Sequence, residues 1–334
     1  MSTKLEVLRT LNDSCGTFIS GQEIANAIGV SRNSVWKAVK SLQSQGFDIL
    51  SSGSEGYCIV NKVDVLSKEL IADQLKNNCD IYILDSVDST NNFAKTLACS
   101  QRPQLVISDC QTQGKGRLGR CFSSPAGKGL YLSIAISPDM DFGKAMLVTC
   151  ISALATVNAI QKVTGLSCTI KWVNDIFLGE KKVCGILTEA ESNLESGKID
   201  KIIVGIGVNC FETDFPEEIK STAGYLANPP KSFDRNQLAA AIVNEFMDLT
   251  TEFDQNKIIH MYRSRSNILG HQIKVFNPSL AKEIGRSGDR VNEGIRARAI
   301  DIDDNGGLII ELLEGKLTRE MRTLNTGEIT IRKL

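Results

Sequence analysis

The segment QTQGKGRLGRCFSSPAGKG, residues 111–129, combines five glycines with four cationic side chains and no acidic residue. Glycines allow backbone N–H groups to approach an anion closely, and the cations neutralise its charge. Apolar runs typical of buried strands flank it at Leu105–Asp109 and Leu130–Ile136. The segment therefore predicts a flexible basic loop that binds a phosphate group between two strands. The alternative is a surface loop with solvated charges.

Known glycine-rich motifs do not account for this loop. Gly114-x-Gly116-x-x-Gly119 matches the spacing of the dinucleotide-binding pattern. That pattern opens a helix, whereas Ser124 and Pro125 exclude a helix here and a strand follows. The loop also matches neither the P-loop nor the kinase glycine loop with its accompanying residues.

Strands and helices are mixed on both sides of the loop. Apolar runs predict further strands at Ile81–Leu84, Thr169–Val173, Val183–Glu189 and Lys201–Val208, and amphipathic spacing predicts helices at residues 90–99, 143–163 and 234–253. Residues 62–80 are typical of a helical linker before this region. The pattern predicts an α+β domain built on a mixed sheet.

Two polar segments follow predicted strands, Lys171-Trp-Val-Asn-Asp175 and Gly205-Ile-Gly-Val-Asn209. Polar groups at the exit of an apolar strand are costly unless they bind something. Alone, each segment is compatible with a snorkelling lysine, an Asx turn or a tight bend. Together with the basic loop, they predict a site for a nucleotide and Mg²⁺.

The first 60 residues are typical of a winged helix-turn-helix. Ser20 can cap a helix that carries Ile24, Gly29 ends it, and Ser31 can cap the next helix. An alternating hairpin at residues 47–60 has the size of a wing.

The polar side chains of the third predicted helix suit contacts with phosphates and base edges. They are Ser31, Arg32, Asn33, Ser34, Lys37 and Lys40. The alternative is a helical protein-interaction module, because residues 1–62 carry only six Lys/Arg against five Asp/Glu.

Short β runs dominate the chain from about Gly270. They cover Gln272–Phe276, Ile295–Ile302, Leu308–Leu313 and Glu328–Arg332. DDNGG at residues 303–307 is a hairpin turn centred on Asn-Gly. This pattern predicts a small β-barrel.

Composition excludes several classes of protein. A chain of 334 residues exceeds the usual size of one hydrophobic core, so two or three domains are expected. No apolar run reaches the ~18 residues of a membrane span, and the N-terminus lacks a signal-peptide core, so we expect a cytoplasmic protein. Ten dispersed cysteines and two histidines disfavour a disulfide framework and a zinc cluster; most cysteines should be reduced and buried.

An ordered set of motifs resembles the bifunctional biotin protein ligases that also act as biotin operon repressors. The motifs are Asp88-Ser-Thr-Asn91, Gln111, Gly114-Lys-Gly-Arg-Leu-Gly-Arg120, Lys171-Trp-Val-Asn-Asp175, Lys182 with Gly185-Ile-Leu187, and Gly205-Ile-Gly-Val-Asn209. The resemblance covers the whole chain and implies an α+β multidomain fold. Its expected parts are a winged helix-turn-helix at residues 1–63, a mixed-sheet α/β catalytic domain of the biotin/lipoate ligase type at residues 64–269, and a small Src-homology-3-type β-barrel at residues 270–334.

The resemblance implies an ATP- and Mg²⁺-dependent biotin-[biotin carboxyl carrier protein] ligase. In the family, the carboxylate of biotin attacks the α-phosphate of ATP and gives biotinyl-5′-AMP and pyrophosphate. A lysine of the biotin carboxyl carrier domain of acetyl-CoA carboxylase, or of a similar carboxylase, then attacks this anhydride. Such steps require the alignment of two anions and neutralisation of their charge.

The family's functional roles fall on matching positions of this chain. The biotin-binding positions are Ser89, Thr90, Asn91, Gln111, Lys115, Gly116, Arg117 and Lys182, of which Lys115, Arg117 and Lys182 carry the catalytic roles. The nucleotide and Mg²⁺ positions are Arg120, Lys171, Asn174, Asp175 and Asn209. Lys115 replaces an arginine of many members, and Val173 replaces a proline. Lysine keeps the charge and loses bidentate geometry, so we expect activity to survive.

The winged helix implies a second function as a biotin-responsive repressor of biotin genes. In the family, biotinyl-5′-AMP is the corepressor, and the loaded protein dimerises through its central sheet on a palindromic operator. The expected partners are therefore operator DNA, a second copy of the chain and the carrier domain, without a membrane. Three alternatives stay open: a lipoate ligase or octanoyl transferase of the same fold, a sensor that has lost catalysis, and a ligase that no longer regulates genes.

Overall fold

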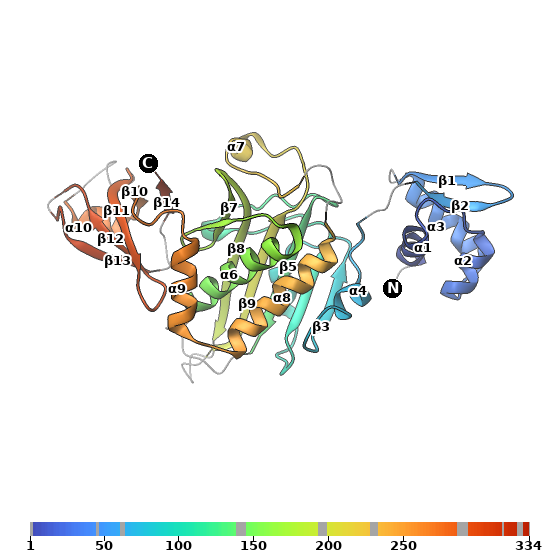
Figure 1. The fold of residues 1–334 in the computed structure, drawn as a ribbon, viewed down its shortest axis with the longest axis horizontal. Helices are drawn as coiled ribbons and strands as arrows, with labels where there is room; N and C mark the ends of the chain where they lie inside the picture. Colours follow the sequence, from blue (N-terminus) through green and yellow to red (C-terminus); the bar gives the residue numbers. More distant parts are fainter. Residues whose placement is uncertain are drawn as a thin grey trace. The chain divides into compact units, whose positions relative to one another are not determined.

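The computed structural model describes residues 3–44, 47–60, 64–137, 145–192, 199–227, 233–285, 293–315, 317–325 and 330–333. The chain divides into two compact units, Met1–Val65 and Leu66–Leu334 (Figure 1). The boundary predicted after residue 63 adjoins residues 61–63, which lie outside the described ranges. The boundary predicted at residues 269/270 falls inside the second unit and stays a prediction.

The first unit is a winged helix-turn-helix, as predicted. Its elements are α1 (Thr3–Asp13), α2 (Gly21–Ile28), α3 (Arg32–Ser44), β1 (Ile49–Ser52) and β2 (Gly56–Ile59), with the two strands paired antiparallel. Ser20 and Glu23 form a capping box at the start of α2, and Gly29 ends it in the left-handed conformation, with φ of 70°. Buried Val7, Ile24 and Val39 join the three helices in one core.

The second unit is built on a seven-stranded mixed sheet in the order β3-β4-β5-β9-β8-β7-β6. The strands are β3 (Asp80–Leu84), β4 (Gln104–Ser108), β5 (Gly129–Ile136), β6 (Thr169–Lys171), β7 (Asp175–Leu178), β8 (Lys181–Ser192) and β9 (Ile199–Asn209). Only the β3–β4 pair is parallel among the described strands of this sheet. The predicted α+β architecture is confirmed.

Helices cover both faces of this sheet. The described helices of the second unit are α4 (Lys68–Ala72), α5 (Thr90–Thr96), α6 (Ala145–Thr164), α7 (Glu217–Lys220), α8 (Arg235–Thr251), α9 (Gln255–Arg265) and α10 (Pro278–Glu283), of which α10 lies beside the C-terminal strands (Figure 1). The helices α6 and α8 lie together over one face (Figure 1). Ala94 of α5 packs on the other face against Val106, Ala135 and Ile203. Because strand side chains alternate between faces, odd-numbered β9 residues from 203 to 207 face α5.

Among the helices that the structure describes, one segment, Met146–Thr164, is long and apolar enough to cross a membrane by length and composition. This modifies the sequence-based expectation that no such run exists. The segment belongs to α6, and most of it is buried within the second unit.

The C-terminal residues form a five-stranded antiparallel sheet in the order β13-β12-β11-β10-β14. Its strands are β10 (Gln272–Phe276), β11 (Ile295–Ile302), β12 (Leu308–Leu312), β13 (Met321–Leu324) and β14 (Thr330–Lys333). The indole Nε1 of Trp172 donates to the carbonyl of Gly306 at 2.8 Å. This bond ties the turn of the C-terminal hairpin to the end of β6.

Several sequence-based boundaries were wrong. Within the described part of the predicted linker helix, residues 64–80, only α4 is helical; Asn244 of α8 accepts from the backbone N–H of Lys76, and the chain then enters β3. The predicted strand Thr169–Val173 ends at Lys171, where the chain turns into β7, which was missed. Helix α9 and strand β13 were also missed. Glu328, the predicted start of the last strand, lies outside the described residues.

The ten cysteines are free, and five of them are buried: Cys58, Cys150, Cys168, Cys184 and Cys210. Cys99 and Cys121 are exposed. The expectation that most cysteines are buried therefore holds for half of them.

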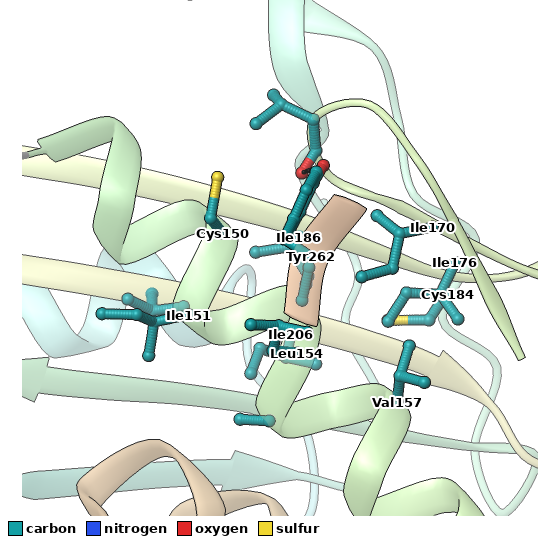
Figure 2. Close-up of a cluster of buried hydrophobic side chains, with 14 of the residues drawn as sticks. Cys150, Ile151, Leu154, Val157, Ile170, Ile176, Cys184, Ile186, Ile206 and Tyr262 are labelled. Carbon is teal, nitrogen blue, oxygen red and sulfur yellow. Dashed lines mark hydrogen bonds between the residues drawn. The ribbon is translucent and has the colours of Figure 1, made fainter. Parts of the chain in front are cut away.

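Tyr262 of α9 lies in the core between α6 and the sheet, near Cys150, Leu154 and Ile186 (Figure 2). Its side chain is fully buried, and its hydroxyl donates to the carbonyl of Val173 at 2.9 Å. Burial raises the pKa of Tyr262 well above its ordinary value, so the hydroxyl stays a donor.

We predict that Tyr262→Phe lowers the free energy of unfolding by about 1–3 kcal/mol, because it leaves a buried carbonyl without its donor. Urea unfolding measures this change. Tyr225→Phe is the matched control, since the Tyr225 hydroxyl contacts Glu212 at the surface at 3.4 Å and its loss should be close to neutral. Equal effects of the two substitutions would contradict the prediction.

Candidate functional site

A cavity of about 730 Å³ opens between the glycine-rich loop, the start of α5 and strands β8 and β9. It is lined by Ser89, Thr90, Asn91, Gln111, Lys115–Phe122, Lys171, Trp172, Asn174, Asp175, Phe177, Glu180, Lys182, Gly185–Leu187, Gly205–Gly207, Glu218, Ile219 and Thr222, except that Gly119 is not among them. Residues widely separated in sequence thus meet in one place.

The first residues of α5 line one end of the cavity with polar, uncharged side chains. Ser89 is the N-cap of α5, and Thr90 and Asn91, its first two residues, are buried. The side-chain oxygen of Gln111 accepts from the backbone N–H of Thr90 at 2.9 Å and from its hydroxyl at 3.1 Å. The Ser133 hydroxyl lies 2.6 Å from the side-chain oxygen of Asn91. Such neutral donors and acceptors suit a neutral polar ligand group.

Glycines form the floor of the cavity. A Cβ at Gly205 would lie 2.3 Å from the side-chain oxygen of Asn91, and a Cβ at Gly207 would lie 2.5 Å from the ring of Phe122. A Cβ at Gly185 would lie 3.2 Å from the same ring and 3.3 Å from the ammonium of Lys182. The neighbours of the three glycines show how the site is arranged over the sheet. Asn91 lies at one side, Phe122 in the middle and Lys182 at the other side.

The other end of the cavity is cationic. Lys182 forms an ion pair with Asp175 at 2.5 Å, and both side chains are about a third exposed or less. Arg117 donates to the side-chain oxygen of Asn174 at 3.2 Å, and the Asn174 amide donates to the carbonyl of Ile186 at 2.7 Å. Burial lowers the pKa of Arg117, while Asp175 opposes this effect. A half-buried guanidinium in the same cavity as a lysine is a site where an anion would be stabilised.

The glycine-rich loop forms a compact turn rather than an open coil. The backbone N–H of Gly116 donates to the carbonyl of Arg120 at 2.7 Å, and residues 117–119 form a single 3₁₀ turn. Gly119 has φ of 71°, and a Cβ at Gly114 would collide with the carbonyl of Phe122 at 2.3 Å. The loop thus needs glycine at both positions.

Neighbouring residues anchor the loop at two points. Lys115 donates to Asn92 at 2.8 Å, and Asn92 donates to Asp88, whose pKa this bond lowers. At the far end, the backbone N–H of Gly127 donates to Asp109, which pairs with the buried Arg235 at 2.8 Å.

Arg32, Asn33, Lys37 and Lys40 of the first unit are exposed on α3, beside an exposed Trp36. Ser31 accepts from the backbone N–H of Ser34 at 3.1 Å and caps the helix. Val35 and Val39 face the core instead. The predicted DNA-contact residues therefore gather at the start and on the solvent side of α3.

Comparisons with known proteins match all three parts of the chain. Residues 83–209 match the model of the biotin/lipoate A/B protein ligase family, residues 3–58 an HTH domain, and residues 290–332 the biotin protein ligase C-terminal domain. The bifunctional ligase/repressor BirA of Bacillus subtilis is 31% identical over 93% of this chain and 94% of its own length. The chain belongs to the bifunctional ligase/repressor family.

Other members and solved structures agree with this family assignment. The BirA protein of Escherichia coli is 25% identical over 89% of both chains. The biotin protein ligase of Aquifex aeolicus, solved in complex with biotin and ATP, covers 76% of this chain and 99% of its own chain, with a TM-score of 0.59 and 26% identity. The catalytic fold expected for a ligase/repressor is thus confirmed.

Most site residues predicted for this ligase/repressor line the one cavity. Ser89, Thr90, Asn91, Gln111, Lys115, Gly116, Arg117, Arg120, Lys171, Asn174, Asp175 and Lys182 all do. Asn209 lies outside the lining, because its amide donates to the carbonyl of Gly224 at 2.9 Å. Lys171 lies over the ring of Phe177, 5.7 Å from its centroid.

Sequence reasoning missed Phe122, Ser133 and Glu189 of this ligase/repressor. Phe122 lies within the quoted loop, but an isolated aromatic residue has no pattern that separates it from a core residue. Ser133 lies between Leu132 and Ile134 in an apolar strand, so a polar residue among apolar neighbours was the available signal there. Glu189 follows Thr188 and is soon followed by Glu191, so the sequence offered no such signal for it.

We predict that inorganic pyrophosphate raises the Tm of this ligase/repressor, because the cationic end of its cavity binds an anion. At about 100 times its Kd the ligand should contribute about 2.7 kcal/mol, a shift of several degrees in a thermal melt. Arg117→Ala should remove most of the shift. Lys76→Ala, which breaks a surface pair with Asp248, should leave it unchanged. A full shift in Arg117→Ala would refute the site.

Proposed function

We propose that this chain is an ATP-dependent biotin protein ligase that forms biotinyl-5′-AMP and transfers biotin to a carrier lysine. One observation carries the proposal: a single cavity joins a neutral polar end at Thr90 and Asn91 to a cationic end at Arg117 and Lys182, with Phe122 between them. Biotin has the matching order of groups, a neutral ureido ring, an apolar chain and a carboxylate.

The cationic end supports the first chemical step. An oxygen of the biotin carboxylate attacks the α-phosphorus of ATP, the bond to the β-phosphate oxygen breaks, and pyrophosphate leaves. Lys182, Lys115 and Arg117 would hold the two reacting anions together and neutralise their charge. Lysine at position 115 serves as a point charge where a bidentate guanidinium is not required.

Asp175 fits the requirements of Mg²⁺ bound to nucleotide phosphates. Mg²⁺ in such sites takes one or two carboxylates, with waters and phosphate oxygens as the remaining ligands. Asp175 supplies the carboxylate on the cavity wall, and Asn174 lies next to it. When bound, Mg²⁺ would neutralise phosphate charge; Arg120 and Lys171 would contribute nearby cations.

The second step transfers biotin to a protein lysine. The unprotonated amine of the carrier lysine attacks the acyl carbon of biotinyl-5′-AMP, AMP leaves with the electron pair of the acyl–oxygen bond, and the amine loses a proton. We propose the biotin carboxyl carrier domain of acetyl-CoA carboxylase as acceptor, because relatives from Mycobacterium tuberculosis and Paracoccus denitrificans carry the name biotin–[acetyl-CoA-carboxylase] ligase. We propose a cytoplasmic location, where ATP and this acceptor occur.

Biotin-dependent ATP–pyrophosphate exchange tests the ligase proposal. We expect exchange with biotin and none with lipoate or octanoate. Lys182→Ala should reduce exchange about 100-fold or more while the Tm stays near that of the wild type, since removal of one charge-stabilising donor typically costs this much. Lys220→Ala, at an exposed pair with Glu217, is the control. Exchange with lipoate alone would assign the chain to the lipoate ligases, and biotin binding without exchange would make it a sensor.

We propose further that the first unit makes the protein a biotin-responsive repressor. The exposed cations of α3 suit the phosphates of DNA, and the wing follows this helix directly. Biotinyl-5′-AMP would be the corepressor that favours a homodimer on a palindromic operator of biotin genes. Transfer of biotin to the carrier would empty the site. Biotinylation of the carrier and repression would therefore compete for the protein loaded with biotinyl-5′-AMP.

We predict that biotinyl-5′-AMP increases self-association in sedimentation velocity and increases affinity for a duplex selected by the loaded protein from a random library. Arg32→Ala and Lys37→Ala should each weaken binding and reduce the salt slope by about one, because each removes a phosphate contact. Lys257→Ala on α9 is the control. DNA binding is followed by the fluorescence of Trp36, which is exposed on α3. Association that does not depend on biotinyl-5′-AMP would contradict the coupling.

A further inference from the structure

Glu189 of β8 lies beside the cavity and holds two side chains of α5. One carboxylate oxygen accepts from the amide Nδ2 of Asn91 at 2.8 Å, and the other accepts from the ammonium of Lys95 at 2.6 Å. Asn91 and Lys95 are four residues apart and therefore lie on one face of the helix. Glu189 thus fixes the first turn of α5, where the neutral polar end of the cavity begins.

The Asn91 amide has two chemically different ends, and Glu189 distinguishes them. Besides Glu189, the Nδ2 group donates to the backbone carbonyl of Leu187 at 3.3 Å. A carboxylate and a carbonyl can only accept, so this end must carry the two protons. The opposite end is therefore the oxygen, which accepts from Ser133 at 2.6 Å and lies above Gly205.

Charge keeps this arrangement in place. Partial burial raises the pKa of Glu189, but the hydrogen bonds from Lys95 and Asn91 outweigh it, and the pKa is lowered overall. The carboxylate is therefore ionised near neutral pH. An ionised acceptor forms a hydrogen bond that is stronger than a neutral one.

We propose that Glu189 is a positioning residue: it fixes the Asn91 carboxamide with its oxygen available to the cavity, and so sets the acceptor that a ureido N–H meets. This inference rests on the proposed function, because the ureido group is that of biotin. The amide oxygen has a second lone pair beyond the one used by Ser133. In Glu189→Gln the facing group can donate as well as accept, so only the weaker bond to the Leu187 carbonyl at 3.3 Å still fixes the amide, and Asn91 turns over more readily and presents an N–H group to the ureido N–H.

Biotin affinity and exchange kinetics test this role. Isothermal titration should show that Glu189→Gln weakens biotin binding by about tenfold, as expected when a charged hydrogen bond is lost. The KM for biotin in pyrophosphate exchange should rise by a similar factor, with kcat within about twofold, since Lys182 and Arg117 are untouched. Lys95→Met keeps the carboxylate and should weaken binding less than threefold.

A double-mutant cycle separates positioning from a merely structural role. In the background of Asn91→Ala, Glu189→Gln should change the Kd for biotin by less than twofold, because there is no amide left to orient. An equal loss in both backgrounds would overturn the proposal. So would a fall in kcat without a change in KM, or a Lys95→Met effect as large as that of Glu189→Gln. If the wild-type protein itself fails to bind biotin, the proposed function falls together with this inference; normal wild-type binding with unaffected Glu189→Gln refutes the inference alone.

Discussion

The site depends on close approach at three glycines of the central sheet. Gly185 and Gly207 are directly paired between β8 and β9, and Gly205 pairs with Leu187. A methyl group at Gly205 would overlap with the side-chain amide of Asn91, and one at Gly207 would overlap with the ring of Phe122. Without these side chains, the strands leave a hollow over an otherwise close-packed sheet. The start of α5 and the glycine-rich loop can then meet the same floor.

The polar and charged ends of that hollow differ because different elements supply them. The neutral end comes from the first turn of α5, with Gln111 at the loop's start. The cationic end comes from the loop's tip and from the β6–β7 turn with Lys182. Charges at one end and neutral donors at the other fix the direction in which an extended acid can lie. The apolar ring of Phe122 lies between Asn91 and Lys182, so a ligand carboxylate is favoured at the end that holds Arg117 and Lys182.

The C-terminal sheet reaches this site through buried polar contacts. Trp172 lines the cavity, and its indole N–H donates to the backbone carbonyl of Gly306 in the C-terminal hairpin. One residue further, the carbonyl of Val173 accepts from Tyr262. The peptide bond between Trp172 and Val173 is cis. The β6–β7 turn that presents Asn174 and Asp175 is therefore held from behind by α9 and by the hairpin at residues 303–307.

The sequence alone predicted the order of the parts and most of the site residues that line the cavity. Capping by Ser20, the Gly29 helix end and the Asn-Gly hairpin are local signals, so they predicted the winged helix and the C-terminal strands. The glycine-rich basic loop was recognisable because its composition has no role in a packed core.

Tertiary structure decided the rest. The end of α4 is followed by a contact with Asn244, far along the chain, whereas the short strand β7 pairs with its sequence neighbours β6 and β8 and was missed because it is only four residues long. Asn209 was turned from the cavity by the Gly224 carbonyl, and the orientation of Asn91 depends on Glu189, 98 residues away. A hydrogen bond between distant residues leaves no periodicity in the sequence, so only the folded chain could reveal it.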